Sequence, residues 1–371
     1  LAKKHGADAI HPGYGFLSEN ADLARACEEN GITFIGPPSH ILAQMGDKLA
    51  AKRIAKRAGV RTIPGTPDPI SDLDEAAKIA EEFGYPVILK AAAGGGGRGM
   101  RKIMNEQELR DSFPLVQSEA VKSFGNGDIF LEKYIEEPKH IEVQVLGDAY
   151  GNIVHLYERD CSVQRRYQKV VEYAPAFTVP QVTRDQLYAD ALKIAHEVGY
   201  INAGTIEFLV DKHGEHFFIE MNPRIQVEHT VTEQTTGVDL VQSQILVAEG
   251  VALDDPELNL TQETIHQYGY AIQCRVTTED PRNNFAPDTG KITLYRSGGG
   301  NGVRLDAGNA FAGAVISPYY DSLLVKITTT DRTFVGAARK ALRSLGEIRV
   351  RGVKTNVPFL MNVLQNKTFL S

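Results

Sequence analysis

The chain has 371 residues, of which 42% are hydrophobic and 23% are charged, and its formal net charge is −7. This length supports a sizeable core and two or three domains. The negative balance argues against a nucleic-acid partner, and no apolar run approaches the ~20 residues that span a membrane. The cysteines Cys27, Cys161 and Cys274 lie far apart, without zinc or disulfide spacing, which fits a reducing compartment.

The first part of the chain has the pattern of a parallel α/β unit. The basic opening LAKKHG resembles the last turn of a helix, so we expect the chain to begin within a domain. We then expect a strand, a helix with Asn20 as its N-cap, a second strand and a longer helix, at Ala7–Ile10, Ala21–Asn30, Ile32–Gly36 and Ile41–Ala58. Three prolines near residues 61–70 indicate a linker.

A second unit follows, and from residue 136 the chain becomes rich in strands. The second unit has two predicted helices and three predicted strands, at Leu73–Phe83, Asn105 to about Phe124, Pro86–Lys90, Met100–Met104 and Asp128–Ile135. Later strands are predicted at 140–148, 152–161, Tyr270–Val276, Lys291–Arg296, Val303–Asp306 and Leu323–Thr328. Later helices are predicted at Thr183–Val198, Val238–Ala248 and Arg332–Leu345. We therefore expect units at 1–62, 63–135 and 136–371.

The segment Thr205–Thr230 concentrates residues that can carry chemistry. Its runs TIEFLVD and EHFFIEMN flank His213-Gly214, which is a hairpin signal. If the loop has two residues, Glu207 lies directly opposite Glu220. Opposed like charges destabilise a hairpin unless a cation lies between them. Carboxylate oxygens are ligands that suit Mg²⁺.

Acidic, amide and guanidinium side chains recur at every second residue beyond this point. If the segment stays extended, one face carries Glu220, Asn222, Arg224, Gln226 and Glu228. Such a face would combine metal ligands, an anion-binding arginine and a possible base. The alternative is a solvated edge strand with ordinary surface charge.

The glycine run Gly94–Gly99 lies between two predicted strands. It lacks both the GK[ST] ending of a P-loop and the strand-to-helix context of a dinucleotide fingerprint. Bare backbone N–H groups can still approach phosphates closely, and Lys90 and Arg98 add positive charge. We interpret the run as a mobile lid, with a flexible solvent-exposed loop as the alternative.

Three further candidates lie along the first half of the chain. Lys48 begins a helical segment and could reach an anion, although a lone lysine is more commonly solvated. The segment Glu132–Ile135 lies at the junction of two units, where a nucleotide base could meet backbone groups. His140 stands beside that junction, as either a ligand or a structural histidine.

The segment Glu158–Glu172, ERDCSVQRRYQKVVE, is strongly basic in its middle. It indicates either an anion pocket or a solvated loop with local ion pairs, through Arg159, Arg165, Arg166 and Lys169. No nearby histidine or helix N-terminus would activate Cys161, so we interpret it as structural. Further along, alternation on the predicted strand Tyr270–Val276 directs Arg275 to a polar face and Cys274 to the core.

Seven segments resemble, in the same order, the biotin carboxylase component of biotin-dependent carboxylases, which belongs to the ATP-grasp superfamily. They are HPGYGFLSEN, MGDK, GYPVILKAAAGGGGRGMR, FLEKYIEEPKHIEVQV, ERDCSVQRR-QKVVE, FIEMNPRIQVEHTVTE and PYYDS. RVTTEDP, VRLDAG, YYDSLLVKI and RVRGVKTNVPFL resemble the pyruvate carboxylases more than the acetyl-CoA or propionyl-CoA carboxylases. The implied fold is mixed α+β and α/β, an ATP-grasp fold with a partial N-terminal parallel α/β domain, a small glycine-rich lid and a C-terminal β-rich domain.

For the residues in the nucleotide-binding motifs, the resemblance implies which part of MgATP each one contacts. Mg²⁺ or Mn²⁺ would be held by Glu207, Glu220 and Asn222. The ATP phosphates would be bound by Lys48, Lys90, His140, Gly94, Gly95, Gly96, Gly97 and Gly99. The adenine would be framed by Glu132, Lys133 and Ile135.

The family's reaction is the ATP-dependent carboxylation of biotin by bicarbonate, through carboxyphosphate. The resemblance makes Glu228 the base that deprotonates bicarbonate, Arg224 the group that grips bicarbonate, and Arg275 the group that stabilises the biotin enolate. Added charge would come from Lys169, and bicarbonate would be oriented by Gln226 and Val227. The remaining cofactor-binding candidates are Gln164 and, against biotin, Tyr14.

Some features depart from the family pattern or lie outside it. Tyr167 stands where the family usually has histidine, and the chain holds neither an MKM biotin-acceptor motif nor a carboxyltransferase barrel. The implied partners are therefore the biotin carrier and carboxyltransferase domains of a longer chain, in a homo-oligomer that the family suggests is a tetramer. The expected location is the cytoplasm, or the mitochondrial matrix in a eukaryote. The alternatives are an acyl-CoA carboxylase component and a nucleotide-binding fragment without turnover.

Overall fold

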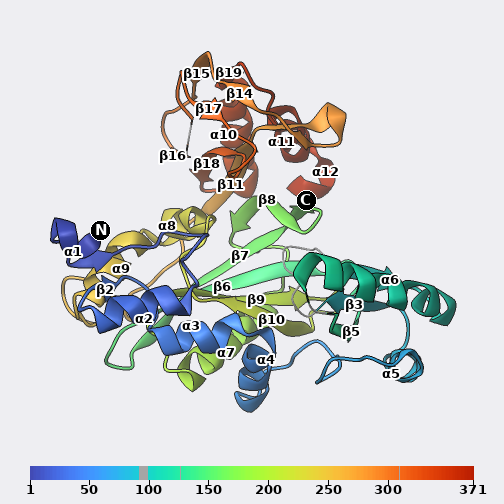
Figure 1. Ribbon diagram of the computed structural model, residues 1–371. Coiled ribbons are helices and arrows are strands. Elements are labelled where there is room, and N and C mark those ends of the chain that lie inside the picture. The colour runs from blue at the N-terminus through green and yellow to red at the C-terminus, as the bar shows by residue number, and fades with distance from the viewer. Residues whose placement is uncertain (92–98, 126, 309) are drawn as a thin grey trace.

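An eight-stranded sheet runs through most of the molecule (Figure 1). The computed structural model describes residues 1–91, 99–125, 127–308 and 310–371. All neighbouring strands of this sheet are antiparallel, in the order β10-β9-β6-β7-β8-β11-β18-β16. In that order the strands are His216–Asn222, Asn202–Val210, Lys139–Gly147, Ile153–Arg165, Gln168–Ala174, Tyr270–Thr277, Leu323–Asp331 and Val303–Ala307.

Alternation along β6 and β9 gives the sheet one apolar face and one polar face. Helix α7 (Gln181–Glu197) packs on the apolar face, against Ile141, Val143, Val145, Ile206 and Phe208. The intervening residues of the same strands point to the opposite face, and they include His140, Glu142 and Glu207. The largest apolar core and the charged residues therefore lie on opposite sides of one sheet.

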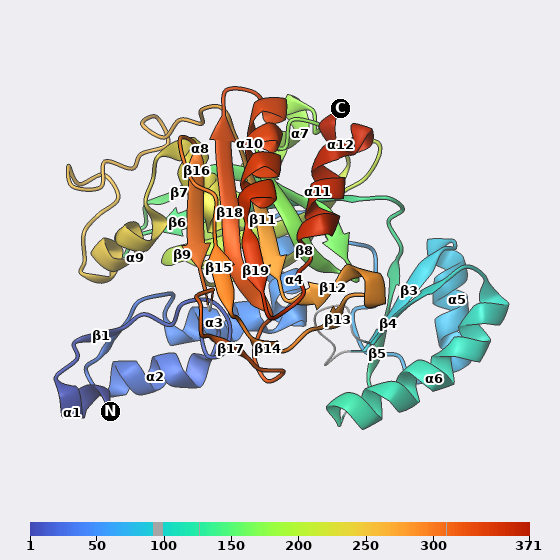
Figure 2. The same cartoon turned by 90° about the horizontal axis from the view of Figure 1, so that it is seen from above.

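A second, three-stranded sheet forms a separate body at one side of the large sheet (Figures 1 and 2). Its order is β4-β3-β5, and its strands and helices are Met100–Ile103 (β4), Val87–Ala91 (β3), Ile129–Lys133 (β5), Leu73–Phe83 (α5) and Glu106–Phe124 (α6). The predicted helix Leu73–Phe83 is confirmed, and Asn105 caps α6 by accepting from the backbone of Glu108. Of the glycine run, residues 92–98 lie outside the described residues, and Gly99 leads into β4.

The proline-rich segment near residues 61–70, which was predicted to be a linker, connects two bodies and pairs with both of them. Single β-bridges join it to both sheets, through Thr62 to Phe218, Gly65 to Glu132 and Ile70 to Ile129. Its backbone groups are thus satisfied by the two bodies that it connects.

The N-terminal elements confirm the predicted parallel unit and correct one helix. Strands Ala9–Ile10 (β1) and Thr33–Phe34 (β2) pair in parallel, and the helices are Ala2–His5 (α1), Ala21–Glu29 (α2), Ser39–Gly46 (α3) and Lys48–Arg57 (α4). The single helix predicted over Ile41–Ala58 is wrong. Asp47 is extended and its carboxylate caps α4, accepting from the backbone of Leu49 and Ala50, so the helix breaks there.

The C-terminal part extends the large sheet and covers it with helices (Figure 2). These helices are Phe334–Glu347 (α10), Val357–Gln365 (α11) and Lys367–Leu370 (α12). Near them lies a short 3₁₀ helix, η1 (Pro281–Asn283). Three two-stranded sheets complete this part: Glu279–Asp280 (β12) with Ala286–Pro287 (β13), Gly290–Lys291 (β14) with Val315–Ile316 (β17), and Leu294–Arg296 (β15) with Arg349–Arg351 (β19). The single strand predicted over Lys291–Arg296 is wrong, since its two ends pair with different partners.

Two elements that the sequence did not suggest connect the parts of the fold. Strand β8 pairs with both β7 and β11, so it joins the two halves of the large sheet. Helix α8 (His229–Thr236) contacts β7, β8 and β11, and it is followed by α9 (Leu240–Ala248). Among the described residues, no helix combines the length and apolar character that a membrane crossing requires.

We predict that Gly147→Ala destabilises the protein by about 1–3 kcal/mol, as overpacked sites do. A methyl group at Gly147 would lie 2.1 Å from the backbone oxygen of Tyr200, which cannot move away without displacing the end of α7. Gly346→Ala is the matched control, because a methyl group there meets nothing within 4 Å. Thermal unfolding of both variants tests this, and equal unfolding temperatures would contradict it.

Candidate active site

The hairpin of β9 and β10 places Glu207 directly opposite Glu220, as predicted. The predicted two-residue loop is wrong. Asp211–Glu215 form a longer turn, in which the Asp211 carboxylate accepts two backbone hydrogen bonds. The strand register next to this turn differs by one residue from the predicted register, and a bulge at Ile219 restores it.

A row of charged residues crosses four neighbouring strands on the polar face. Cross-strand pairing places Arg159 of β7 beside Glu142 of β6, Glu142 beside Glu207 of β9, and Glu207 beside Glu220 of β10. Glu220 reaches this face because the bulge reverses the alternation of β10 after Phe218 has packed into the core. Adjacent carboxylates repel one another, so the row requires cations on the same face.

Lys169 of β8 supplies the central cation. Its Nζ lies 2.8 Å from Oε1 of Glu207 and 2.7 Å from Oε1 of Glu228, and it also donates to Glu142. Burial acts to lower the pKa of Lys169, but these three carboxylates raise the pKa well above the ordinary lysine value. The ammonium group therefore stays protonated at neutral pH.

Glu207 is contacted from several sides. Nε2 of His140 lies 2.6 Å from one carboxylate oxygen, and the side-chain amides of Asn222 and Gln226 donate to the other at 2.8 and 3.2 Å. Burial acts to raise the pKa of Glu207, but Lys169 and His140 bring the pKa well below its usual value. Glu207 is thus a fixed negative charge.

Glu228 reaches the same cluster from the start of a helix. Strand β10 ends at Asn222, and Glu228 is the residue immediately before α8. The prediction of one extended face from Glu220 to Glu228 is therefore wrong beyond Asn222. Gln226 and Glu228 nevertheless both contact Lys169, because the chain turns back toward β8.

Arg275 bridges two buried carboxylates from β11. Its Nε donates to Glu172 at 2.5 Å and its Nη2 donates to Glu228 at 2.8 Å. The prediction for this strand is confirmed, since Arg275 is on the polar face and Cys274 is buried in the core. Burial acts to raise the pKa of Glu228, but Lys169 and Arg275 hold the pKa far below its usual value.

Sequence reasoning missed Glu142 and Glu172 among the charged residues that build this cluster, and it expected Arg159 in either an anion pocket or a solvated loop. All three residues are fully buried. Arg159 Nε lies 2.5 Å from Glu142, and Arg159 also donates to Gln144 at 2.8 Å. One signal was present, because His140, Glu142 and Gln144 alternate with apolar residues in HIEVQVLGD.

Glu220 marks the position at which a divalent cation fits. Burial, and then the neighbouring charge of Glu207, raise the pKa of Glu220, although Lys48 opposes this effect. A cation between the two carboxylates would remove their repulsion. Glu207, Glu220 and the side-chain oxygen of Asn222 are hard oxygen donors, so this donor set fits Mg²⁺.

A second grouping of possible ligands is less suited to a metal ion. Ligand atoms of His140, Glu142 and Glu207 lie within 4.8 Å of one another. Lys169 and Arg159 already balance the charge of these carboxylates. A divalent cation is therefore more favourable on the side of Glu207 that faces Glu220.

The candidate nucleotide-binding residues lie where the two sheets approach each other. Glu132 of β5 forms ion pairs with Lys90 of β3 and with Lys52 of α4, a residue that sequence reasoning missed. Burial acts to raise the pKa of Glu132, but the two lysines lower it. Lys133 Nζ donates to the backbone oxygen of Gly84 at 2.6 Å.

The remaining candidate residues for nucleotide binding lie around helix α4, strand β5 and the glycine run. Ile135 is half-buried just after β5, and Lys48 is the first residue of α4. The candidates Gly94, Gly95, Gly96 and Gly97 lie outside the described residues. Gly99 accepts a hydrogen bond from the backbone of Ala91 at 2.8 Å, which closes the base of the loop.

Further candidates line the opposite end of the cluster. Arg224 forms an ion pair with Glu19 of the N-terminal loop at 3.2 Å. The backbone oxygen of Val227 accepts from Lys326 at 2.9 Å, and Lys326 Nζ lies 5.6 Å from the centre of the Tyr14 ring. These contacts bring the N-terminal loop to the charged cluster.

The predicted basic pocket in Glu158–Glu172 is only partly correct. Lys169 belongs to the cluster, but Arg165 donates to Glu279 at 3.0 Å and Arg166 to Asn284 at 3.1 Å, so both tie the β7–β8 turn to the C-terminal part. Cys161 is fully buried, which agrees with a structural role, and its backbone oxygen accepts from the Gln164 side chain at 2.8 Å. Tyr167 lies in the exposed turn.

Three family models match consecutive parts of the chain. They are the biotin carboxylase N-terminal domain over residues 1–42, the ATP-binding domain of carbamoyl-phosphate synthase L chain over 47–256, and the biotin carboxylase C-terminal domain over 273–371. The mitochondrial pyruvate carboxylase of Mus musculus is 59% identical over 371 residues. The whole chain is covered in that comparison but only 31% of the relative, so the chain spans about a third of its length.

Two solved biotin carboxylase structures match over most of their own length. The biotin carboxylase domain of Hydrogenobacter thermophilus 2-oxoglutarate carboxylase, in complex with MgADP, ADP and bicarbonate, is 50% identical with a TM-score of 0.94. That match covers 100% of this chain and 80% of the solved one. Biotin carboxylase from Campylobacter jejuni is 45% identical with a TM-score of 0.93, covering 99% and 81%. The chain therefore belongs to the biotin carboxylase family.

Proposed function

We propose that this chain carries out the biotin carboxylase half-reaction of a pyruvate carboxylase, in which ATP and bicarbonate are used to carboxylate biotin. The observation that carries the proposal is the position of Lys169. One ammonium group joins Glu207, a carboxylate suited to magnesium, to Glu228, a carboxylate that can act as a base. The nucleotide and bicarbonate would thus bind on two sides of the Lys169 side chain. The solved relative that holds MgADP together with bicarbonate supports this arrangement.

In this proposal, bicarbonate binds among Lys169, Arg224 and Arg275, and Glu228 removes its proton. The same cations keep Glu228 ionised, because they hold its pKa far below the usual value. An ionised carboxylate with so low a pKa is a weak base. Bound bicarbonate would compete for the charge of Lys169 and Arg275, and this competition would raise the pKa of Glu228 when a proton must be accepted.

At the other end of the cluster, Glu207, Glu220 and Asn222 would hold Mg²⁺, which neutralises charge on the transferred phosphate when it is bound. Lys48, Lys90 and His140 would contact the phosphates. Lys90 would then exchange part of its contact with Glu132 for a phosphate oxygen, leaving Lys52 to balance Glu132. We place the lid within 63–135, next to the nucleotide.

The remaining steps would require more than this chain. Pyruvate carboxylation calls for a biotin carrier domain and a carboxyltransferase domain, and the match to about a third of the mouse relative leaves room for both. We propose that these domains belong to the same longer polypeptide and that it forms a homo-oligomer. A mitochondrial location is supported by the name of the mouse relative, with a cytoplasmic location as the alternative.

We predict that Glu228→Gln in the full-length protein lowers bicarbonate-dependent ATP hydrolysis, measured with free biotin, by roughly 10²–10⁴-fold, because the amide cannot accept the proton. Glu257→Gln, at an exposed loop carboxylate, is the matched control and should retain normal activity. Full activity of the Glu228 variant would remove this residue as the base. Normal MgATP binding without turnover in the unmodified protein would instead favour a silent nucleotide-binding domain.

We predict that Glu220→Gln weakens MgADP binding at least about ten-fold by calorimetry, since one oxygen ligand of the metal loses its charge. The same variant should be more stable than the wild type at pH 8 when magnesium is absent. Because the pKa of Glu220 is raised in the folded protein, folding takes up a proton at pH values between the unfolded and the folded pKa. Stability of the wild type therefore falls as pH rises through that pKa.

This second effect has its own check. Below the pKa of an unfolded carboxyl group, about 4.3, Glu220 is protonated in both states, and the two proteins should have equal unfolding temperatures. Glu257→Gln, at an exposed loop carboxylate, should change neither the affinity for MgADP nor the pH dependence. If Glu220→Gln lowered stability at pH 8, the repulsion assigned to this residue would be wrong.

A further inference from the structure

Lys326 of β18 is a buried lysine next to the charged cluster. Only 3% of the residue is exposed. Cross-strand pairing places it directly opposite Arg275 of β11 on one side and Asp306 of β16 on the other. Because directly paired residues share one face of a sheet, Lys326 extends the polar face beyond Arg275. Two cations thus stand side by side here, an arrangement that costs free energy.

The ammonium group of Lys326 has no carboxylate of its own. In the part of the chain that the structure describes, it forms no ion pair. Arg304 binds the carboxylate of Asp306 through two hydrogen bonds of 2.9 Å, and it also binds Glu233. Burial, with the charges of Arg304 and Arg275, lowers the pKa of Lys326, although Asp306 and Glu233 oppose this effect.

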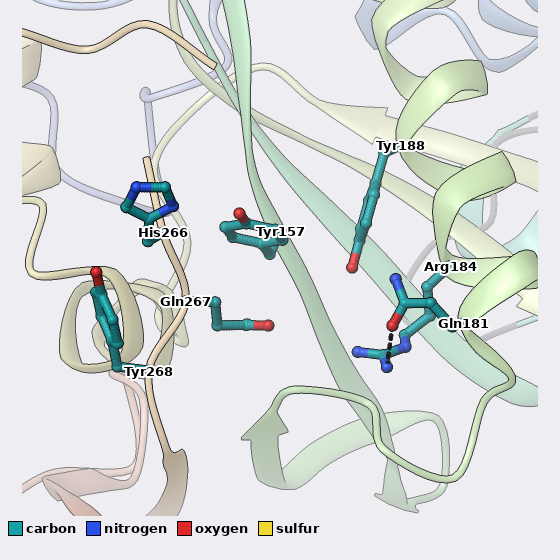
Figure 3. A pocket seen from close by; sticks show the side chains of 7 residues that line it. All are labelled: Tyr157, Gln181, Arg184, Tyr188, His266, Gln267 and Tyr268. Atoms are coloured by element: carbon teal, nitrogen blue, oxygen red, sulfur yellow. Dashed lines mark hydrogen bonds between the residues drawn. The ribbon is translucent and has the colours of Figure 1, made fainter. Parts of the chain in front are cut away.

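Two other buried cations of the large sheet and its helices are neutralised by acidic partners. Lys169 contacts three carboxylates. Arg184 of α7, which lines a pocket on the other side of the molecule (Figure 3), lies 3.2 Å from the buried Glu158. Lys326 differs from both, and replacing an uncompensated buried charge by an apolar side chain is commonly neutral or stabilising. Stability alone therefore does not account for a lysine at this position.

The polar contact that Lys326 makes is to the backbone of the turn before α8. Its Nζ donates to the carbonyl oxygen of Val227 at 2.9 Å. Val227 lies between Gln226 and Glu228, and both of these side chains contact Lys169. Lys326 therefore binds the backbone at the point between the two residues that reach the cluster.

The turn itself has only local backbone structure. Residues 223–228 lie between β10 and α8 and belong to neither. Two backbone hydrogen bonds of 3.2 Å, from His229 to Gln226 and from Val231 to Glu228, close the turn onto itself. Such bonds fix the shape of a turn but not its place relative to the sheet. The contact from Lys326 ties the turn to β18, which is the neighbour of β11.

We propose that Lys326 is a positioning residue for the bicarbonate part of the site. By holding the carbonyl of Val227, it keeps the turn and the Glu228 carboxylate beside Lys169. It acts through the turn and not on a substrate. Misplacement of a reacting group by about 1 Å can lower a rate by about 10²-fold, so a displaced turn would impair catalysis. This inference rests on the proposed function, because it takes Glu228 as the base.

Lys326→Met in the full-length protein tests the proposal, because methionine keeps the apolar stem and removes the ammonium group. We expect kcat/KM for bicarbonate, measured as bicarbonate-dependent ATP hydrolysis with free biotin, to fall at least about ten-fold. The affinity for MgADP, measured by calorimetry, should stay within about two-fold of the wild type. The unfolding temperature should not fall, since an unpaired buried charge is lost together with its repulsion for Arg275. A lower unfolding temperature with weakened binding of both ligands would show a merely structural role.

Lys340→Met is the matched control. Nζ of Lys340 also donates to a carbonyl oxygen of β18, that of Thr330 at 2.7 Å, but near the end of the strand and not at the turn. This variant should keep the wild-type kcat/KM for bicarbonate. Lys326→Gln, whose side chain is one atom shorter, should behave as Lys326→Met does, and it keeps the test valid if the methionine variant does not fold.

Amide hydrogen exchange separates a failure of this inference from a failure of the proposed function. Exchange in residues 225–231 should become at least about ten-fold faster in Lys326→Met, while exchange in α10 stays unchanged. Unchanged exchange in the turn, or a normal kcat/KM for bicarbonate, would overturn the positioning role. If the wild type shows no bicarbonate-dependent hydrolysis, the proposed function is wrong, and exchange alone then decides whether Lys326 holds the turn.

Discussion

The structure depends on one buried ammonium group that lies among carboxylates from several strands. Glu142, Glu207 and Glu228 could not share a desolvated surface unless Lys169 stood between them. Arg159 and Arg275 complete the balance at the two sides, through Glu142 and Glu228. Since these residues come from β6, β7, β8, β9, β11 and the start of α8, the cluster also joins the two halves of the large sheet. The candidate site is therefore part of what holds the fold together.

Small irregularities in the strands decide which side chains reach this cluster. The bulge at Ile219 brings Glu220 to the polar face, whereas regular alternation from the buried Phe218 would have kept it in the core. The bulge around Tyr157 does the reverse for Glu158, which turns toward α7 while Arg159 stays with the carboxylates. Each extra residue changes the face of everything that follows, because side chains alternate with a period of two. The charged cluster and the ion pair between Glu158 and Arg184 thus lie on opposite faces of one sheet.

Several features of the fold and site were predictable because they depend on local pattern. The helix Leu73–Phe83, the N-caps Asn20 and Asn105, and the two faces of β11 follow from periodicity and capping chemistry. The opposition of Glu207 and Glu220 was also predicted, although from a loop length that proved wrong. A longer turn and a one-residue bulge have opposite effects on register, so the two errors cancelled at this pair. Beyond Asn222 no such compensation exists, and the expected extended face is replaced by a turn and a helix.

The sequence by itself determined the family of the protein and named most of the residues that the structure brings together in the charged cluster, because family motifs and hydrophobic periodicity are properties of short stretches. It did not indicate strand β8, helix α8 or the roles of Glu142 and Glu172, and it did not predict that Arg159 pairs with Glu142. These depend on which strands become neighbours, and strands 60 or more residues apart carry no local record of their pairing, as with Glu142 and Glu207. Only the tertiary structure decided that Lys169 stands among three carboxylates, since buried charges are selected by the charges around them and not by their neighbours in the chain.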